Sequence, residues 1–440
     1  MIRCAPLLLM LGCSSYQVNS DAANGSDASY TSANTGTGSS DTDSSTTIGE
    51  VEDDFLTLPP AQTDIYVFVA NPARDTVSRI NVETLEVRTT DVGIDPDIVI
   101  TTPDYTTAAV FNRGDDTVSL IDADTLDIVT VPVRDNFNNM KMSPDGRFVA
   151  VWHDIDAEEA DDPPADGLQS FNETSFVDVL TGDHWPMAVG FNPRDVVFTP
   201  NGQTAAVVSD EYLAIVDLTL EPILPHLIEL DPGLLDAPRA EEVILSHDGT
   251  WAFVRQLGAE DILVVDLLTS QVDRVPVGLN PTDLDLSPDG NEAVVLARGS
   301  QEVWVLDAHD PFDTPVVHSV PGGLGFGSLI FDPTGDTAVL FTNAALIDRY
   351  ATWNRNSDEI TVRALVKPVV GMAITPTGES MLAFHTEDDA LDADPDGPFY
   401  GAWVLTMISL VDFRTNPLKL PAKFNGFANS TNGNFGYFIM

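Results

Sequence analysis

A segment with aspartate at alternate positions, 392–397, carries the clearest signal for chemistry in this sequence. It reads Asp-Ala-Asp-Pro-Asp-Gly, which matches the first half of a calcium-binding loop. Hard Ca²⁺ prefers several carboxylate oxygens, and a tight loop can aim alternate side chains inward while glycine allows the turn. The twelfth position is Trp403 rather than glutamate, so the bidentate ligand of an EF-hand is missing. The predicted calcium ligands are Asp392, Asp394 and Asp396, with Glu387 or Asp388 supplying the missing carboxylate.

The charge of the whole chain supports a second interpretation of that segment. The sequence contains 69 Asp and Glu residues against 20 Lys and Arg residues, which gives a formal net charge of −49. Segment 392–397 can therefore also be a solvated acidic loop in a protein that is acidic throughout. The same charge excludes nucleic acid as a partner, because its phosphates would be repelled. The lysines are Lys141, Lys367, Lys419 and Lys423.

Several common catalytic and cofactor motifs are missing from the sequence. It has no nucleophile elbow, Walker loop, His-Glu-x-x-His or Gly-x-Gly-x-x-Gly, and no Cys-x-x-Cys-His. We therefore expect neither a nucleotide nor a haem cofactor, and calcium is the one cofactor that the sequence suggests.

The elements that must position these residues come from an internal repeat. Segments 190–202 and 278–290 both read Gly-x-Asn-Pro, then a short apolar strand, then Pro-Asn-Gly or Pro-Asp-Gly. Segment 93–103 repeats the pattern less completely. The second turn recurs at a spacing of roughly 40–50 residues with about four short strands per unit, which is typical of a β-propeller. The predicted fold is all-β, a propeller of four-stranded blades.

Two units also resemble a known family. Segments 70–81 and 111–122 share the sequence Asp-Thr-Val-Ser-x-Ile and resemble the YVTN-type repeat of lactonase-like β-propellers. With the two turns, the resemblance extends over about residues 64–440. It implies the fold and leaves the function open, because that family includes scaffolds, binding modules and a few enzymes.

The number of blades follows from the ends of the repeat. Strand 65–70 lacks a preceding inner strand, and the last inner strand, near 426–430, has only strand 435–439 after it. We expect the C-terminal inner strand to complete the first blade, which gives eight blades. Because strand 435–439 competes for the same place, a seven-bladed ring is the alternative.

Two insertions lie between the second and third strands of their units. They cover 153–167 and 385–397, and each begins with a histidine that ends an apolar strand. In this architecture such loops share one face with the connections between blades, and rigid scaffolds usually carry function on such loops. Besides the calcium candidates, the predicted residues of this face are His153, Asp154, Asp156 and His385.

A second candidate site lies where the innermost strands begin, beside the mouth of the channel. The fifth residue after the glycine of each Gly-x-(Asn/Asp)-Pro turn, or its equivalent, is polar in four consecutive units. The resemblance to lactonase-like propellers implies a central divalent cation held from such positions. The alternative is that these side chains only cap turn amides or face water. The residues are Asn139, Asp195, Glu242 and Asp283.

The N-terminus resembles a bacterial lipoprotein signal. A short apolar run follows Arg3 and ends before Cys13, which would receive the lipid after cleavage. The predicted organisation is a signal peptide over 1–12, a disordered tether over 13–58 and a propeller over 59–440, with an ordinary signal peptide as the alternative. We expect a protein anchored in the bacterial cell envelope, at the outer membrane on its periplasmic or surface side.

These observations favour a monomeric binding or scaffold module that meets a protein or another extracellular ligand through its acidic loops. One alternative is a lactonase-like hydrolase with a channel-mouth cation that polarises a carbonyl. Another is a structural protein of the cell surface.

Overall fold

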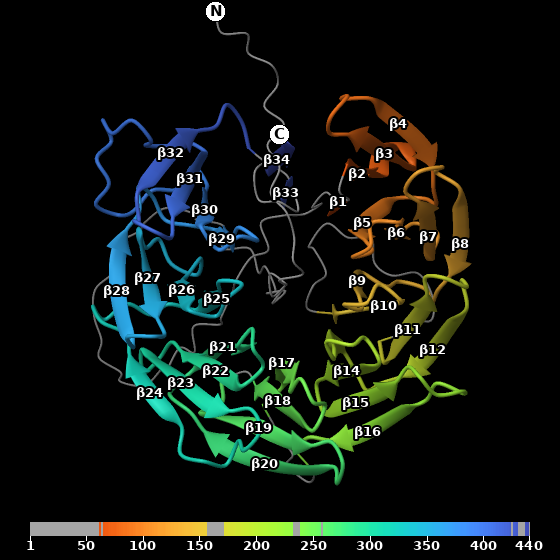
Figure 1. The fold of residues 1–440 in the computed structure, drawn as a ribbon, viewed down its shortest axis with the longest axis horizontal. Coiled ribbons are helices and arrows are strands. Elements are labelled where there is room, and N and C mark those ends of the chain that lie inside the picture. The colour runs from red at the N-terminus through yellow and green to blue at the C-terminus, as the bar shows by residue number, and fades with distance from the viewer. Residues whose placement is uncertain are drawn as a thin grey trace, which may run out of the picture.

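Eight four-stranded antiparallel sheets follow one another along the chain in the computed structural model of the protein (Figure 1). The structure describes residues 65–155, 171–231, 238–256 and 258–423, and the backbone of 61–62, 426–429 and 436–439. The one helix in this part of the chain is the 3₁₀ turn η1 (Pro72–Arg74), so no described helix is long and apolar enough to span a membrane.

The first four sheets cover the N-terminal half of the ring. The first contains β1 (Ala61–Gln62), β2 (Tyr66–Asn71), β3 (Thr76–Asn81) and β4 (Val87–Asp91), and the second contains β5 (Pro96–Thr101), β6 (Thr107–Asn112), β7 (Thr117–Asp122) and β8 (Ile128–Pro132). The third contains β9 (Asn139–Met142), β10 (Phe148–Trp152), β11 (Glu173–Asp178) and β12 (His184–Ala188). The fourth contains β13 (Pro193–Phe198), β14 (Thr204–Ser209), β15 (Tyr212–Asp217) and β16 (Pro225–Glu229).

The next four sheets complete the ring. The fifth contains β17 (Ala240–Leu245), β18 (Trp251–Gln256), β19 (Asp261–Asp266) and β20 (Gln271–Pro276), and the sixth contains β21 (Pro281–Leu286), β22 (Glu292–Ala297), β23 (Glu302–Asp307) and β24 (Val316–Ser319). The seventh contains β25 (Ser328–Phe331), β26 (Thr337–Phe341), β27 (Arg349–Asn354) and β28 (Glu359–Ala364). The eighth contains β29 (Gly371–Ile374), β30 (Ser380–His385), β31 (Val404–Ser409) and β32 (Thr415–Lys419).

The first strand of each sheet lies nearest the centre of the ring and the fourth lies at its periphery, as comparison of β5 with β8 or β25 with β28 shows (Figure 1). The sheets are therefore the blades of an eight-bladed β-propeller, which confirms the predicted fold class and the favoured blade number.

The ring closes differently from the prediction. The inner place of the first blade is taken by the two-residue strand β1, where Ala61 pairs with Phe68. The C-terminal strands β33 (Gly426–Asn429) and β34 (Gly436–Ile439) pair with each other instead, and β33 contacts β1. This hairpin lies between the first and eighth sheets (Figure 1). Pairing neighbours in sequence costs less chain entropy than joining the two ends of the domain, so each end forms its own local pair.

The core lies between adjacent blades, because the second to seventh sheets each have a neighbouring blade on both faces. All five residues of β10 are buried, and so are four of the five in β26. Phe176 of the third blade and Phe198 of the fourth meet edge to face across one such layer, with ring centroids 6.3 Å apart. Burial on both faces explains why these strands are almost continuously apolar rather than alternating.

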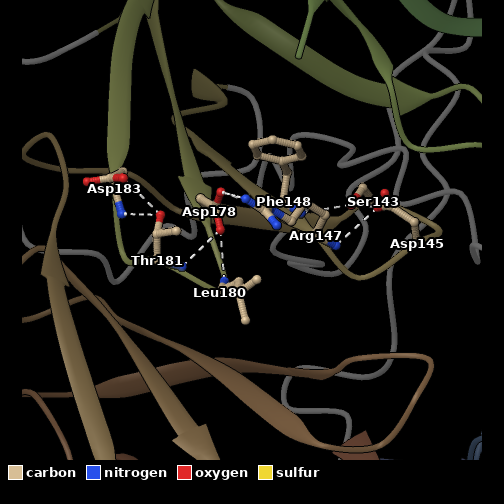
Figure 2. Close-up of polar contacts among 8 residues, drawn as sticks. All are labelled: Ser143, Asp145, Arg147, Phe148, Asp178, Leu180, Thr181 and Asp183. Carbon is tan, nitrogen blue, oxygen red and sulfur yellow. Dashed lines mark hydrogen bonds and ion pairs between the residues drawn. The ribbon is translucent and has the colours of Figure 1, made fainter. Parts of the chain in front are cut away.

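The repeated Pro-Asp-Gly turn joins the first and second strands of a blade. In the third blade, Ser143 Oγ donates to Asp145 Oδ1 at 2.6 Å and accepts the amide of Phe148 at 2.9 Å (Figure 2). Gly146 closes the turn at a φ of 73°, a left-handed conformation that glycine adopts without strain. The same hydroxyl or carboxylate bonding recurs at Thr102, Thr199, Ser246, Ser287, Asp332 and Thr375.

Candidate functional site

The connections that leave second strands and those that join successive blades lie on one face of the ring, because the strands of each sheet alternate in direction. We call this the loop face. It contains the second insertion, the described root of the first at 153–155 and the beginnings of the innermost strands, so the described candidates from both predicted sites share it.

The channel-mouth candidates begin with Asn139 and Asp195. Asn139 is the first residue of β9 and its side-chain amide donates to Asn138 Oδ1 at 3.1 Å. Asp195 follows a bulge in β13, and its Oδ1 accepts Lys141 Nζ of the preceding blade at 2.8 Å. The carboxylate of Asp195 therefore links two blades through an ion pair.

Glu242 and Asp283 also follow bulges, and both are buried. Glu242 Oε2 accepts Arg255 Nε at 2.9 Å, and both side chains are at most 4% exposed. Asp283 Oδ2 accepts the backbone amide of Leu329 in the next blade, and its Oδ1 accepts the amide of Leu284 at 3.1 Å. Glu242 therefore joins two strands of its own sheet, and Asp283 joins its sheet to the next one.

The structure places the four channel-mouth residues at equivalent starts of successive strands, as the repeat predicted. Three of them already bind a lysine, an arginine or a backbone amide. Nowhere in the described ranges do three His, Cys, Asp or Glu side chains converge in a way that could hold a metal ion. The cation predicted for this ring stays a prediction.

The first insertion is fastened at its root. His153 is buried, and its Nδ1 bonds with the carbonyl oxygen of Asn136. Asp154 and Asn138 exchange two bonds, from the Asp154 amide to Asn138 Oδ1 at 2.8 Å and from Asn138 Nδ2 to the Asp154 carbonyl at 2.7 Å. Both predicted residues therefore fix the described root of the insertion to the segment directly before β9. Asp156 lies outside the described residues.

Arg194 is the centre of a polar cluster that the sequence analysis did not single out. Its guanidinium pairs with Glu241 of the next blade and lies 3.9 Å from Asp154 Oδ1 of the preceding one. Nearby, Asn192 Nδ2 donates to Asp210 Oδ1 at 3.1 Å. Burial raises the pKa of the Asp210 carboxyl, and the positive charge of Arg194 opposes that shift.

The second insertion exposes its acidic residues. Asp394 Oδ1 accepts the amide of Asp396 at 3.0 Å, and the Asp394 carbonyl accepts the amide of Gly397 at 2.9 Å. The alternating aspartates thus form a tight turn, and calcium binding there stays a prediction. The exposed side chains are Glu387, Asp388, Asp392, Asp394 and Asp396.

A buried lysine lies under this loop, and sequence reasoning missed it. Lys367 precedes β29 and its side chain is 2% exposed. Its Nζ lies 2.9 Å from both the Ala402 carbonyl oxygen and Asp389 Oδ1. It also donates to the carbonyls of Glu387 at 3.2 Å and Phe399 at 3.3 Å. The one sequence signal is the rarity of lysine in this chain.

His385 lies inside the protein beside this lysine. Its Nδ1 is 2.9 Å from the Pro368 carbonyl oxygen and its Nε2 is 2.9 Å from Thr406 Oγ1. Burial lowers the pKa of His385 to about 4, and the positive charge of Lys367 acts in the same direction. The ring is therefore neutral at pH 7 and joins β30, β31 and the segment before β29.

Comparison with known proteins supports the fold and gives no family. No family model matches the chain, and no curated protein does. Among solved structures, the dihydro-haem d1 dehydrogenase NirN in complex with DHE is 15% identical, with a TM-score of 0.55 over 88% of this chain and 77% of NirN. The β-propeller domain of Cps50 (Swd1) from Myceliophteria thermophila is 14% identical, with a TM-score of 0.43 over 65% of this chain and 91% of that domain. Hydrazine synthase from Kuenenia stuttgartiensis is 18% identical, with a TM-score of 0.41 over 72% and 98%. At these identities the similarity extends to the fold alone.

Proposed function

We propose that this protein is a lipid-anchored, extracytoplasmic β-propeller of the YVTN type that acts as a binding or scaffold module through its loop face. The N-terminal lipoprotein pattern at Cys13 supports the anchor, and the shared Asp-Thr-Val-Ser-x-Ile segments support the type of repeat. Both rest on the sequence, and Cys13 lies outside the described residues.

The observation that carries the proposal is the separation of charge on the loop face. Three cations of this face, Arg194, Arg255 and Lys367, are buried in pairs with carboxylates. In the second insertion Asp389 pairs with Lys367, and the other five carboxylates, from Glu387, Asp388, Asp392, Asp394 and Asp396, are exposed. A face arranged in this way presents fixed negative charge to solvent, so it attracts a partner whose surface is positively charged.

The hydrolase alternative gains no support from the geometry. A channel-mouth cation would need the carboxylates of Asp195, Glu242 and Asp283, and these bind Lys141, Arg255 and the amide of Leu329. We therefore do not adopt the hydrolase alternative as the proposed function.

Binding is tested with poly-lysine immobilised on a biosensor as a defined cationic probe. The triple variant Asp392→Asn, Asp394→Asn and Asp396→Asn should bind about 10-fold more weakly than wild type at low salt, because three charges leave one face. The matched control removes three exposed carboxylates from the opposite face, at or next to the connections between third and fourth strands, namely Glu83, Glu221 and Glu359. Equal weakening of both triples would show that only bulk charge matters and would refute the loop-face proposal.

Anchoring is tested separately. Cys13→Ala should move the protein from the membrane fraction to the soluble fraction, because lipid is its only predicted membrane attachment. Unchanged partitioning, or a mature protein without lipid on Cys13 by mass spectrometry, would refute the anchor.

A further inference from the structure

The loop 386–403, which joins β30 to β31, contains no strand and gathers around a single positive charge. Carbonyl oxygens from its beginning, at Glu387, and from its end, at Phe399 and Ala402, all face Lys367 Nζ. Their distances from the ammonium lie between 2.9 and 3.3 Å. The two ends of the loop are therefore held by one group that belongs to neither of them.

A carboxylate completes this arrangement. Asp389 Oδ1 lies 2.9 Å from Lys367 Nζ, and Asp389 Oδ2 accepts the amide of Gly401 at 2.8 Å. Hard cations in proteins are bound by such sets of carbonyl and carboxylate oxygens. An ammonium group donates up to three hydrogen bonds, and here it takes the position that a bound cation would have.

Lys367 is itself fixed from outside the loop. It lies on the connection between β28 and β29, and the carbonyl of the next residue, Pro368, bonds with His385 Nδ1. His385 ends β30, directly before the loop, and Thr406 of β31 accepts or donates at its other nitrogen. The backbone beside Lys367 is therefore bonded through His385 to β30 and β31 of the eighth blade.

We propose that Lys367 is the positioning residue of the loop face: its ammonium is the permanent cation around which loop 386–403 takes shape. This inference rests on the proposed function, because the loop presents the acidic residues that would meet a partner. In this proposal the ammonium of Lys367 fixes the conformation of loop 386–403, so the loop keeps that conformation without an added metal ion. Leu391, which is 98% exposed, projects from this fixed loop together with the carboxylates.

The test compares Lys367→Ala with Lys419→Ala, which removes the same charge from an exposed position on β32. Backbone hydrogen exchange of peptides from 386–403 is measured in EDTA, with β26 as an internal reference. Wild type and Lys419→Ala should protect the loop equally. Lys367→Ala should exchange about 10-fold or more faster in the loop and unchanged in β26, because hydrogen bonds to a charged group are lost there.

Chemical rescue separates positioning from bulk. Propylammonium replaces the atoms that Lys367→Ala removes, so it should restore protection of the loop, while propanol and NaCl of equal ionic strength should not. Asp389→Asn keeps the lysine and should loosen the loop without any response to propylammonium. Unchanged exchange of loop 386–403 in Lys367→Ala, or equal loss of protection in β26, would overturn the proposal.

The two proposals fail in different ways. Exchange reports the shape of the loop whether or not a partner binds, while the poly-lysine experiment reports binding by a loop that is already folded. A protected loop that does not discriminate between the two triple variants would refute only the proposed function.

Discussion

Replacing Asp178 by alanine should destabilise the third blade more than the equivalent change in any blade whose aspartate lacks an arginine partner. Asp178 Oδ1 accepts the amides of Leu180 at 2.9 Å and Thr181 at 3.0 Å (Figure 2). Its Oδ2 accepts Arg147 Nε at 2.8 Å and Nη2 at 2.5 Å. One carboxylate therefore joins the turn after β11 to the turn before β10.

The magnitude follows from these four bonds. The two turn amides resemble a helix cap and contribute about 1 kcal/mol together or slightly more. The Asp178 side chain is 5% exposed, but that of Arg147 is 41% exposed, so solvent screening reduces the ion pair to about 1 kcal/mol. The residues that carry the two turn amides, Leu180 and Thr181, are exposed, so water replaces the lost acceptor and no further cost is added. We expect Asp178→Ala to lower the free energy of unfolding by about 2 kcal/mol.

Asp217 is the matched control in the fourth blade. Within the described chain its carboxylate accepts the amide and hydroxyl of Thr219, at 2.9 and 2.6 Å, and forms no ion pair. Asp217→Ala should therefore cost only about 1 kcal/mol, measured by urea unfolding at constant m-value. In a double-mutant cycle, Arg147→Gln and Asp178→Ala should couple by about 1 kcal/mol. Equal costs for the two aspartates, or zero coupling, would contradict the reasoning.

Three further measurements address the turns, the buried histidine and calcium. Gly202→Ala should lower the free energy of unfolding by at least about 1 kcal/mol more than Gly249→Ala, measured in urea. Both glycines have φ near 67°, so the backbone strain is the same. A Cβ at position 202 would lie 2.3 Å from Asp145 Oδ1, whereas the nearest atom to a Cβ at position 249 is 3.9 Å away. The pKa of His385 falls from 6.5 to about 4 on folding, so the unfolded chain binds this proton at a higher pH than the folded protein does. The free energy of unfolding should therefore decrease as the pH falls from about 6.5 to about 4, and His385→Gln should remove up to about 3 kcal/mol of that decrease. An unchanged pH profile of stability in the variant would refute the shift. If calcium binds the second insertion, CaCl₂ should raise the melting temperature more than MgCl₂ or NaCl of equal ionic strength, and Asp394→Asn should abolish the difference; equal responses would indicate a solvated loop.

The fold could be predicted because its signals are local and repeated. The turn at Ser143 is specified by four adjacent residues, and the same bond from a hydroxyl to an aspartate or asparagine Oδ1 recurs in several blades. Closure of the ring could not be predicted in the same way. Strand β1 has only two residues, so it shows no alternation that periodicity could detect, and its pairing with β2 decides which strand completes the first blade.

The described candidate residues lie at the strand ends of the loop face, but their partners were not foreseen. Lys141 and Asp195 are 54 positions apart, Arg194 and Glu241 are 47 apart, and Asp283 and the Leu329 amide are 46 apart. Each separation is close to one repeat, because each contact joins equivalent places in adjacent blades. Opposite charges at one repeat spacing were therefore a signal in the sequence, and they predict links between blades rather than a shared metal.

Lys367 shows where such signals end. Three of its four partners are backbone carbonyl oxygens, which every residue carries, so no pattern of side chains could have indicated them. What the sequence does contain is a strong imbalance, with four lysines in a chain of net charge −49. An ammonium that is 2% exposed in such a chain needs enough oxygen partners to offset its lost hydration, and an acidic loop wrapped around it provides them. In this loop the buried ammonium of Lys367 holds the backbone from below. The exposed carboxylates of the same loop therefore stay on the surface, where they face solvent.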